Sequence, residues 1–150
     1  MRLTVYTDYA LRVLMYLAVK QDGLATIDEI AKSYSISRNH LMKVVHQLGV
    51  AGYIETVRGR DGGLRLAKPV EAIGLGAVVR YTEPDMAIAS CFKPVDAPCA
   101  IRQCCVLRPA LEKARDAFID VLEGYTLSDL VRPRGRLLGM LGISAIQAQR

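Results

Sequence analysis

The chain opens with apolar residues spaced three and four apart, which is the period of one helix face. Between Thr7 and Lys20 this pattern predicts an amphipathic helix, and Gly23 follows it as a stop signal. Asp8 falls in the first turn, where the positive end of the helix dipole favours a carboxylate. The residues expected on the buried face are Ala10, Val13, Leu14, Leu17 and Ala18.

Two further helical patterns follow at a short interval. Thr26 and Glu29 have the spacing of a capping box, which predicts a short helix over 27–33. After a three-residue turn, Ser37 can cap a longer helix that ends near Ala51. The inner face expected for this longer helix consists of Leu41, Val44, Val45, Leu48 and Ala51.

The outer face of this longer helix is polar and basic. It carries Arg38, Asn39, His40 and Lys43, and Ser37 precedes them at the start of the helix. A short helix, a tight turn and a longer helix with such a face are typical of a helix-turn-helix. Arg and Asn side chains are suited to reading base edges, and Lys is suited to neutralising phosphate. The sequence therefore predicts that these five residues contact double-stranded DNA.

A hairpin is predicted next. Strand-forming residues over 53–57 and 64–66 flank a glycine-rich tip that carries Arg58 and Arg60. After a helix-turn-helix such a hairpin is a wing, whose arginines can enter a minor groove. Taken alone, each element is also compatible with a plain helical hairpin or a solvated turn, but their order and charge favour DNA binding. The glycines are not a phosphate loop, because no Lys-Ser/Thr pair follows them.

The second half contains a short helix predicted over 73–82 and a long one from Arg108 to Glu123. Along the long helix, apolar residues recur alternately four and three apart, as in a heptad seam. Such a seam can be core, but helix-turn-helix proteins usually dimerise to meet two half-sites, so we expect a homodimer through it. The seam consists of Leu107, Leu111, Ala114, Phe118, Val121 and Tyr125. Thr126 and Asp129 are expected to cap a last short turn of helix.

All four cysteines lie in one segment, from Cys91 to Cys105, that has neither helical nor strand periodicity. Thiols gathered in one loop serve a disulfide, a metal centre or redox chemistry. The apolar residues near the start are interrupted by Asp8 and Arg12, so we expect no secretory signal and a reducing, cytoplasmic location. The alternative is four unrelated buried cysteines, since free Cys often behaves as a small buried hydrophobe.

The spacing of the thiols bears on the kind of centre. Zinc usually takes cysteines in closely spaced pairs, whereas the gaps here suit a loop around a larger object such as an iron-sulfur cluster. Adjacent thiols such as Cys104 and Cys105 rarely serve one centre together, so we expect three cysteine ligands and one spare. A thiol oxidoreductase is disfavoured, because the loop lacks a Cys-x-x-Cys pair and an acid-base partner.

Composition and charge indicate which kind of partner the protein binds. The chain of 150 residues is 51% hydrophobic and 23% charged, enough to bury a core, and no apolar run is long enough to cross a bilayer. Its net charge of +5 is uneven: residues 1–68 hold ten Lys/Arg against six Asp/Glu, and residues 69–131 hold six against nine. The basic front therefore indicates contact with a polyanion at that end only.

These features together resemble a known family, the iron-sulfur winged-helix transcriptional regulators, over about residues 1–131. The resemblance is carried by Leu3-Thr4, Thr7-Asp8-Tyr9-Ala10-Leu11-Arg12, Ser37 to Val44, Ala51-Gly52-Tyr53, Arg58-Gly59 to Gly62-Gly63, Leu66 to Pro69, the spaced cysteines and Tyr125 to Leu130. Ser37-Arg38-Asn39-His40 and the run from Tyr125 to Val131 are most similar to the nitric-oxide-sensing repressors of the family. A branch that senses cluster supply also uses a histidine where this chain has Arg108.

The resemblance implies that Cys91, Cys99 and Cys105 bind an iron-sulfur cluster, with 4Fe-4S favoured over 2Fe-2S. It also implies that Asp8 of the partner subunit is the fourth ligand. The implied function is that of a non-enzymatic repressor, which binds a palindromic operator as a homodimer and releases it on nitrosylation or cluster loss. The extra Cys104 and the longer first gap leave open whether Cys104 can replace Cys105. A regulator of the same fold that senses cluster supply or redox state is the alternative.

We therefore expect a mainly α fold with a small β-hairpin wing. Its parts are a winged helix-turn-helix region over 1–82, a cluster-binding loop over 83–106, a dimerisation helix with its C-terminal cap over 107–131, and a basic, flexible tail over 132–150. The apolar run from Leu137 to Ile146 within that tail can dock on a neighbour, form a helix or do neither, and the sequence does not decide between these.

Overall fold

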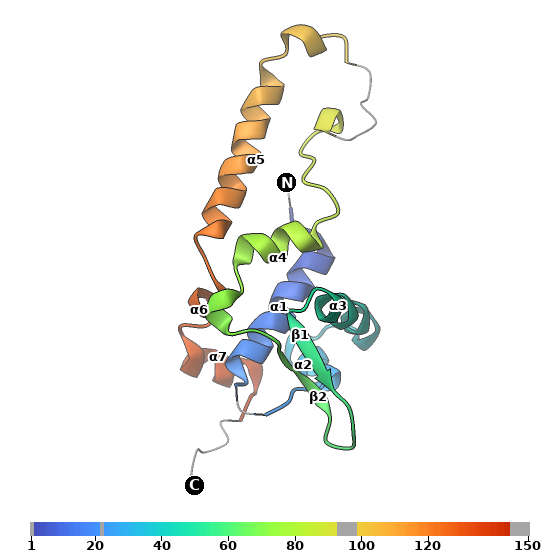
Figure 1. The fold of residues 1–150 in the computed structure, drawn as a ribbon, viewed down its shortest axis with the longest axis vertical. Coiled ribbons are helices and arrows are strands. Elements are labelled where there is room, and N and C mark those ends of the chain that lie inside the picture. The colour runs from blue at the N-terminus through green and yellow to red at the C-terminus, as the bar shows by residue number, and fades with distance from the viewer. Residues whose placement is uncertain (1, 22, 93–98, 145–150) are drawn as a thin grey trace.

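The computed structural model describes residues 2–21, 23–92 and 99–144. A body of short helices and one hairpin surrounds α1, and the long helix α5 projects from this body (Figure 1). The elements are α1 (Val5–Val19), α2 (Ile27–Tyr34), α3 (Arg38–Val50), β1 (Ile54–Val57), β2 (Gly63–Leu66), α4 (Leu75–Thr82), α5 (Leu107–Glu123), α6 (Leu127–Leu130) and α7 (Arg134–Leu141). The expected fold class, mainly helical with a hairpin wing, is confirmed.

Helix α1 forms the centre of the core. The apolar face expected for it is buried, and Ala10, Val13 and Leu14 have no exposed surface. The inner face of α3 packs against the same core through Leu41 and Leu48, which are also fully buried. Because fully burying each such side chain contributes about 1.5–3 kcal/mol, this packing fixes which face of α3 points to solvent.

The capping box at the start of α2 forms as expected. Thr26 Oγ1 accepts a hydrogen bond from the Glu29 backbone N–H at 3.2 Å, and Glu29 Oε2 accepts one from the Thr26 backbone N–H at 2.6 Å. Burial raises the pKa of Glu29, but the hydrogen bonds from Lys20 and Thr26 outweigh it and lower the pKa overall. The turn after α2 passes through Ser35, whose φ of 53° allows the chain to reverse into α3.

The wing is an antiparallel pair in which Ile54 lies opposite Leu66 and Val57 lies opposite Gly63. It is joined to the body by two hydrogen bonds with Ala25, which donates to the Leu64 carbonyl at 3.0 Å and accepts from the Leu64 N–H at 2.8 Å. A Cβ at Gly63 would lie 2.8 Å from the Ala25 carbonyl oxygen, so this close approach requires glycine.

Helix α5 is anchored to the body at its C-terminal end. The backbone N–H of Leu75 donates to the Tyr125 carbonyl at 2.9 Å, and that of Leu127 donates to the Ile73 carbonyl at 2.8 Å. Gly76 packs so closely on α5 that an added Cβ would lie 2.7 Å from Cγ of Glu123. The other end of α5 extends away from the body (Figure 1).

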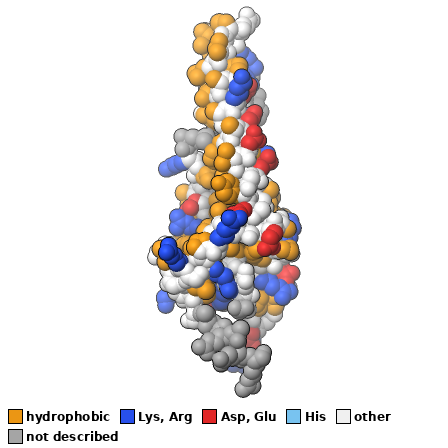
Figure 2. Space-filling model, turned by 90° about the vertical axis from the view of Figure 1, so that its left-hand side faces the viewer, with side chains coloured by type: hydrophobic (Ala, Val, Ile, Leu, Met, Phe, Trp, Pro, Cys, Tyr) orange, Lys and Arg blue, Asp and Glu red, His pale blue; other side chains and the backbone are white. Residues whose placement is uncertain are grey.

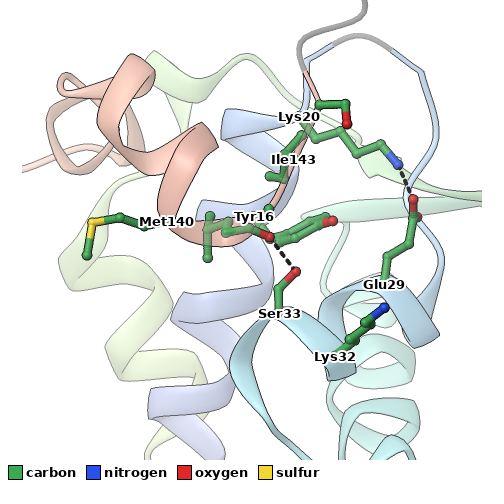
Figure 3. Close-up of a pocket in the computed structure, with 10 residues that line it drawn as sticks. Tyr16, Lys20, Glu29, Lys32, Ser33, Met140 and Ile143 are labelled. Atoms are coloured by element: carbon green, nitrogen blue, oxygen red, sulfur yellow. Dashed lines mark hydrogen bonds and ion pairs between the residues drawn. The ribbon is translucent and has the colours of Figure 1, made fainter.

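Residues 134–141 belong to the tail that we expected to be flexible, but they form helix α7 instead. Its leucines pack on the core, and Arg134 Nε donates to the Val19 carbonyl at 3.0 Å. At the far end of α7, Ser33 Oγ donates to the Leu141 carbonyl at 2.8 Å, which joins the tail to α2 (Figure 3). Arginines precede and interrupt this segment, but its leucines decide its position.

We predict that Leu138→Ser lowers the free energy of unfolding by about 1–2 kcal/mol, because Leu138 packs on the core and would leave a polar group there. Met140 is the matched control. Its side chain is 82% exposed on the same helix, so Met140→Ser should change stability by less than about 0.5 kcal/mol. Urea unfolding followed by circular dichroism checks both values, and equal effects would contradict the docking of α7.

Within the part of the chain that the structure describes, every helix is too short or too polar to cross a bilayer.

Candidate nucleic-acid interface and thiol site

Helix α3 presents the polar face that the sequence predicts. Ser37, Arg38, Asn39, His40 and Lys43 are all exposed, whereas the opposite face is buried. Ser37 occupies the N-cap position, but its side chain makes no capping hydrogen bond. Its hydroxyl is therefore available to another partner. The face is thus held on a rigid element, as base reading requires.

Two of these side chains contact neighbouring helices. Arg38 Nε lies 2.8 Å from Asp28 Oδ1 of α2. The His40 ring lies 6.2 Å, centroid to centroid, from the ring of Tyr9 on α1. Lys43 has no hydrogen-bond or ion-pair partner within the described residues. Its ammonium group is consequently available for a phosphate.

The wing presents its basic tip to solvent. Arg58 and Arg60 are exposed at the turn, next to Gly59, whose φ of 127° is a conformation that favours glycine. Behind the tip, Arg65 is paired with Glu55 across the two strands. The Lys68 ammonium lies 5.0 Å from the centre of the Tyr53 ring. Arg58 and Arg60 thus add positive charge to an exposed turn.

The cysteine segment lies toward the outer end of α5 (Figure 1). Cys91 lies in the 3-10 turn Ser90–Phe92, and Cys104 ends a second such turn, Arg102–Cys104. All four cysteines are free thiols; Cys99 and Cys104 are exposed, and Cys91 and Cys105 are half-buried. The alternative of four buried structural cysteines is therefore wrong.

Phe92 attaches the segment to α5. The guanidinium carbon of Arg108 lies 5.7 Å from the centre of the Phe92 ring, and that of Arg115 lies 5.5 Å from it. Each contact is within the range of a cation-π interaction, typically about 0.5–1 kcal/mol at an exposed site. The two arginines are seven residues apart on one face of α5, so the turn that carries Cys91 is held beside the helix.

Asp8 lies in the first turn of α1, as predicted, and its side chain is 47% exposed. Its carboxylate is 3.0 Å from Nε of Arg12, whose guanidinium also lies 5.6 Å from the Tyr34 ring centre. Within residues 2–21, 23–92 and 99–144, no three Cys, His, Asp or Glu side chains are close enough to hold a metal ion. A single chain thus does not bring the expected ligands together in the part described.

Glu83 is a residue that sequence reasoning missed. Its Oε1 accepts hydrogen bonds from the Thr4 backbone N–H at 2.8 Å and from the Thr7 hydroxyl at 2.5 Å. Thr7 is fully buried, so its side of this contact is shielded from water. Glu83 therefore ties the end of α4, ahead of the cysteine segment, to the end of α1 that carries Asp8. No local signal marks it, because its partners are more than seventy residues away in the chain.

Much of the seam of α5 is uncovered in the single chain, although Leu111 and Phe118 are half-buried. Leu107 is 64% exposed and Val121 is 62% exposed, and Tyr125 continues the exposed surface. Figure 2 shows hydrophobic side chains along the length of the projecting helix. Apolar surface of this extent on one helix is typical of an interface rather than of a solvent-facing helix.

A cleft of about 610 Å³ lies between α1, α2 and the end of α7 (Figure 3). Its charged groups are Lys32 and the ion pair of Lys20 with Glu29, whose N–O distance is 2.7 Å. None of the predicted site residues lines it.

A helix-turn-helix with a wing, a thiol-bearing segment and a long uncovered helix define a class of protein, the winged-helix transcriptional regulators. The chain belongs to the Rrf2 family, whose model is described as "Iron-dependent Transcriptional regulator" and matches residues 3–133. It is therefore a transcriptional regulator of that family, and the expected resemblance is confirmed.

Relatives and solved structures agree with this family. The chain is 49% identical over 142 residues to the HTH-type transcriptional regulator NsrR of Bacillus subtilis, covering 94% of this chain and 97% of the relative. The NsrR of Bacillus licheniformis is 48% identical, with 94% and 99% covered. The structure of CymR, described as the global cysteine regulator of B. subtilis, matches with a TM-score of 0.69 and 28% identity over 87% of this chain and 95% of CymR. The structure of IscR of T. potens matches with a TM-score of 0.72 and 21% identity. The match covers 100% of this chain and 94% of the IscR chain, and it shows that the two share a fold.

Proposed function

We propose that the protein is a nitric-oxide-sensitive repressor that binds a palindromic operator as a homodimer. In this proposal Cys91, Cys99 and Cys105 of one protomer, together with Asp8 of the partner subunit, hold an iron-sulfur cluster, for which 4Fe-4S is favoured. The observation that carries the proposal is the group of free thiols beside the outer part of a helix whose apolar seam is uncovered. The naming of relatives as NsrR supports the choice of signal.

The donor set fits such a cofactor. Thiolates are the usual ligands of iron-sulfur clusters, and all four thiols are free, with none in the buried core. When bound, the cluster supplies iron that can take up a small diatomic ligand, more readily where a carboxylate rather than a thiolate is the protein ligand. The contacts of Phe92 with Arg108 and Arg115 hold Cys91 beside α5.

Asp8 is available for a shared site. Its ion pair with Arg12 is solvent-exposed, and exposed pairs of this kind contribute only about 0–1 kcal/mol, so little free energy opposes a change of partner. A carboxylate contributed across the dimer would make the spacing of the two α3 helices depend on the cofactor. Loss of the cofactor would then weaken operator binding, because a palindromic operator fixes the distance between the two α3 helices that read it.

The DNA contacts are assigned to α3 and the wing. Arg38, Asn39 and Ser37 are suited to base edges and nearby phosphates, with His40 beside them, while Lys43, Arg58 and Arg60 supply positive charge without base selectivity. Several phosphate contacts in each half-site release counterions on binding. Operator affinity should therefore fall steeply as salt rises.

An anaerobic DNA-retardation assay tests the proposal, using cluster-loaded, iron-free and nitric-oxide-treated protein on one inverted-repeat operator. We expect the cluster-loaded form to bind with a dissociation constant at least about a hundredfold lower than the other two, within the usual ratio of specific to non-specific binding. Equal binding by iron-free protein would contradict the cofactor's role. Indifference to nitric oxide, combined with release on iron withdrawal, would point to sensing of cluster supply instead.

A further inference from the structure

The side chain of Arg38 at the start of α3 is held from two sides. Its Nε lies 2.8 Å from Oδ1 of Asp28, which is in the first turn of α2. Its Nη1 lies 3.7 Å from the sulfur of Met42, one turn further along α3. All three side chains are exposed. A long, exposed side chain is thus restrained at the surface that reads DNA in the proposed function.

Stability does not explain the pair. An exposed ion pair contributes little, because water screens the charges and both side chains lose freedom. The position is also unfavourable for binding DNA in general, since the first helix of a helix-turn-helix crosses the phosphate backbone. A carboxylate at the start of α2 is therefore close to where phosphates are expected, and its charge lowers the affinity for any duplex.

The geometry leaves Arg38 able to read a base. The guanidinium has five N–H donors in a fixed plane, and its ion pair with Asp28 is made at Nε. Within the described residues Nη2 donates no hydrogen bond, and Nη1 makes only the weak contact with sulfur. A guanine presents O6 and N7 as two acceptors side by side in the major groove, which a forked pair of donors matches.

Restraint before binding also favours discrimination. Ordering a free arginine side chain opposes binding to every sequence, whereas an arginine already oriented by Asp28 and Met42 loses less freedom when it meets the matching base. The Asp28 carboxylate also competes with a nearby phosphate for the guanidinium. The carboxylate thus weakens non-specific contacts and preserves the specific one.

We propose that Asp28 is a specificity-determining residue: it orients Arg38 toward a guanine in each half-site and disfavours other DNA. It acts through Arg38 and is therefore a positioning residue. This inference rests on the proposed function, in which α3 reads the operator. It goes further by assigning one base contact and the side chain that controls it.

The test uses the full-length, cluster-loaded homodimer under anaerobic conditions. The wild-type protein first selects its preferred duplex from a randomised inverted-repeat pool. Fluorescence anisotropy then measures affinity for that duplex, for a set in which each half-site base pair is replaced in turn, and for a random-sequence duplex. The variants are Asp28→Asn, Arg38→Ala and the double variant, with thermal unfolding as a check on folding.

We expect Asp28→Asn to bind the random duplex several-fold more tightly and to lose about tenfold of the discrimination at one base pair, the scale of a single bidentate contact. Arg38→Ala should lose discrimination at that same base pair. In the double variant the asparagine should cause no further loss there. Glu71→Gln is the matched control, because Glu71 is an exposed acid in the turn Val70–Ala72, and it should leave the discrimination profile unchanged.

The outcomes separate the inference from the proposed function. If the wild-type protein shows no sequence preference, both are overturned. If the wild-type protein discriminates but Asp28→Asn keeps the same profile at every base pair, the inference alone is overturned. Loss of discrimination at a base pair that Arg38→Ala does not affect would also overturn it, because Asp28 would then act by another route.

Discussion

Cys105→Ser is expected to give protein that retains no iron and binds its operator at least about a hundredfold more weakly, whereas Cys104→Ser retains both properties. The two thiols are adjacent but differ in setting. The sulfur of Cys104 lies 3.6 Å from the Ile101 carbonyl oxygen, so it is directed back toward its own turn. Cys105 follows that turn with an extended backbone and is half-buried. We therefore assign Cys105 as the ligand and Cys104 as the spare.

Each of the two variants is the control for the other, since the same atom is replaced at neighbouring positions. Iron and acid-labile sulfide content, the visible absorption spectrum and anaerobic DNA retardation are measured for both. Loss of iron in Cys104→Ser with retention in Cys105→Ser would reverse the assignment. Full retention in both would show that neither thiol is required when the other is present.

The second large effect is expected on α5. Val121→Glu should convert the dimer to a monomer and weaken operator binding by roughly a thousandfold, because one half-site provides only part of the contacts of a palindrome. Val121 is 62% exposed in the single chain, so a carboxylate there costs little in the monomer. In a paired seam the same charge would be buried without a partner, which typically costs several kcal/mol.

Lys113→Glu provides the control for this prediction. It introduces the same side chain on the same helix, at an exposed position outside the seam. Analytical ultracentrifugation should show a dimer for Lys113→Glu and a monomer for Val121→Glu. A dimer for both variants would mean that the seam of α5 is not the interface.

The elements that could be predicted from the sequence are those with local signals. The capping boxes at Thr26 and Thr126 place the starts of α2 and α6, because each pairs a hydroxyl with a carboxylate three residues later. Helical spacing of apolar residues predicts the buried faces of α1 and α3. The wing follows from strand-forming residues on both sides of a glycine-rich turn.

The features that were missed depend on long-range contacts. Helix α7 docks through Leu137 and Leu138. The sequence shows this apolar run after a basic start, but it did not decide whether the run would dock or form a helix. The Glu83 contacts with Thr4 and Thr7 join residues that only the folded chain brings together. Composition and spacing cannot indicate such pairs, since neither describes which distant segments meet.

The residue types of the candidate site could be predicted from the sequence. How those residues come together in space could not. The clustered cysteines and the basic face of α3 can be recognised in the sequence, and in the structure both lie outside the buried core. The expected role of Asp8 is different. No spacing rule relates it to the cysteines, and within the described residues one chain assembles no three-ligand metal site, so this assignment stays a prediction.

The four thiols lie outside the buried core, which is built from α1, α3, the wing and the helices around them. If these thiols hold the proposed cluster, we therefore expect the DNA-reading body to fold without it. A protomer that has lost the cluster would then keep its fold and could take up a new one without new synthesis of the chain.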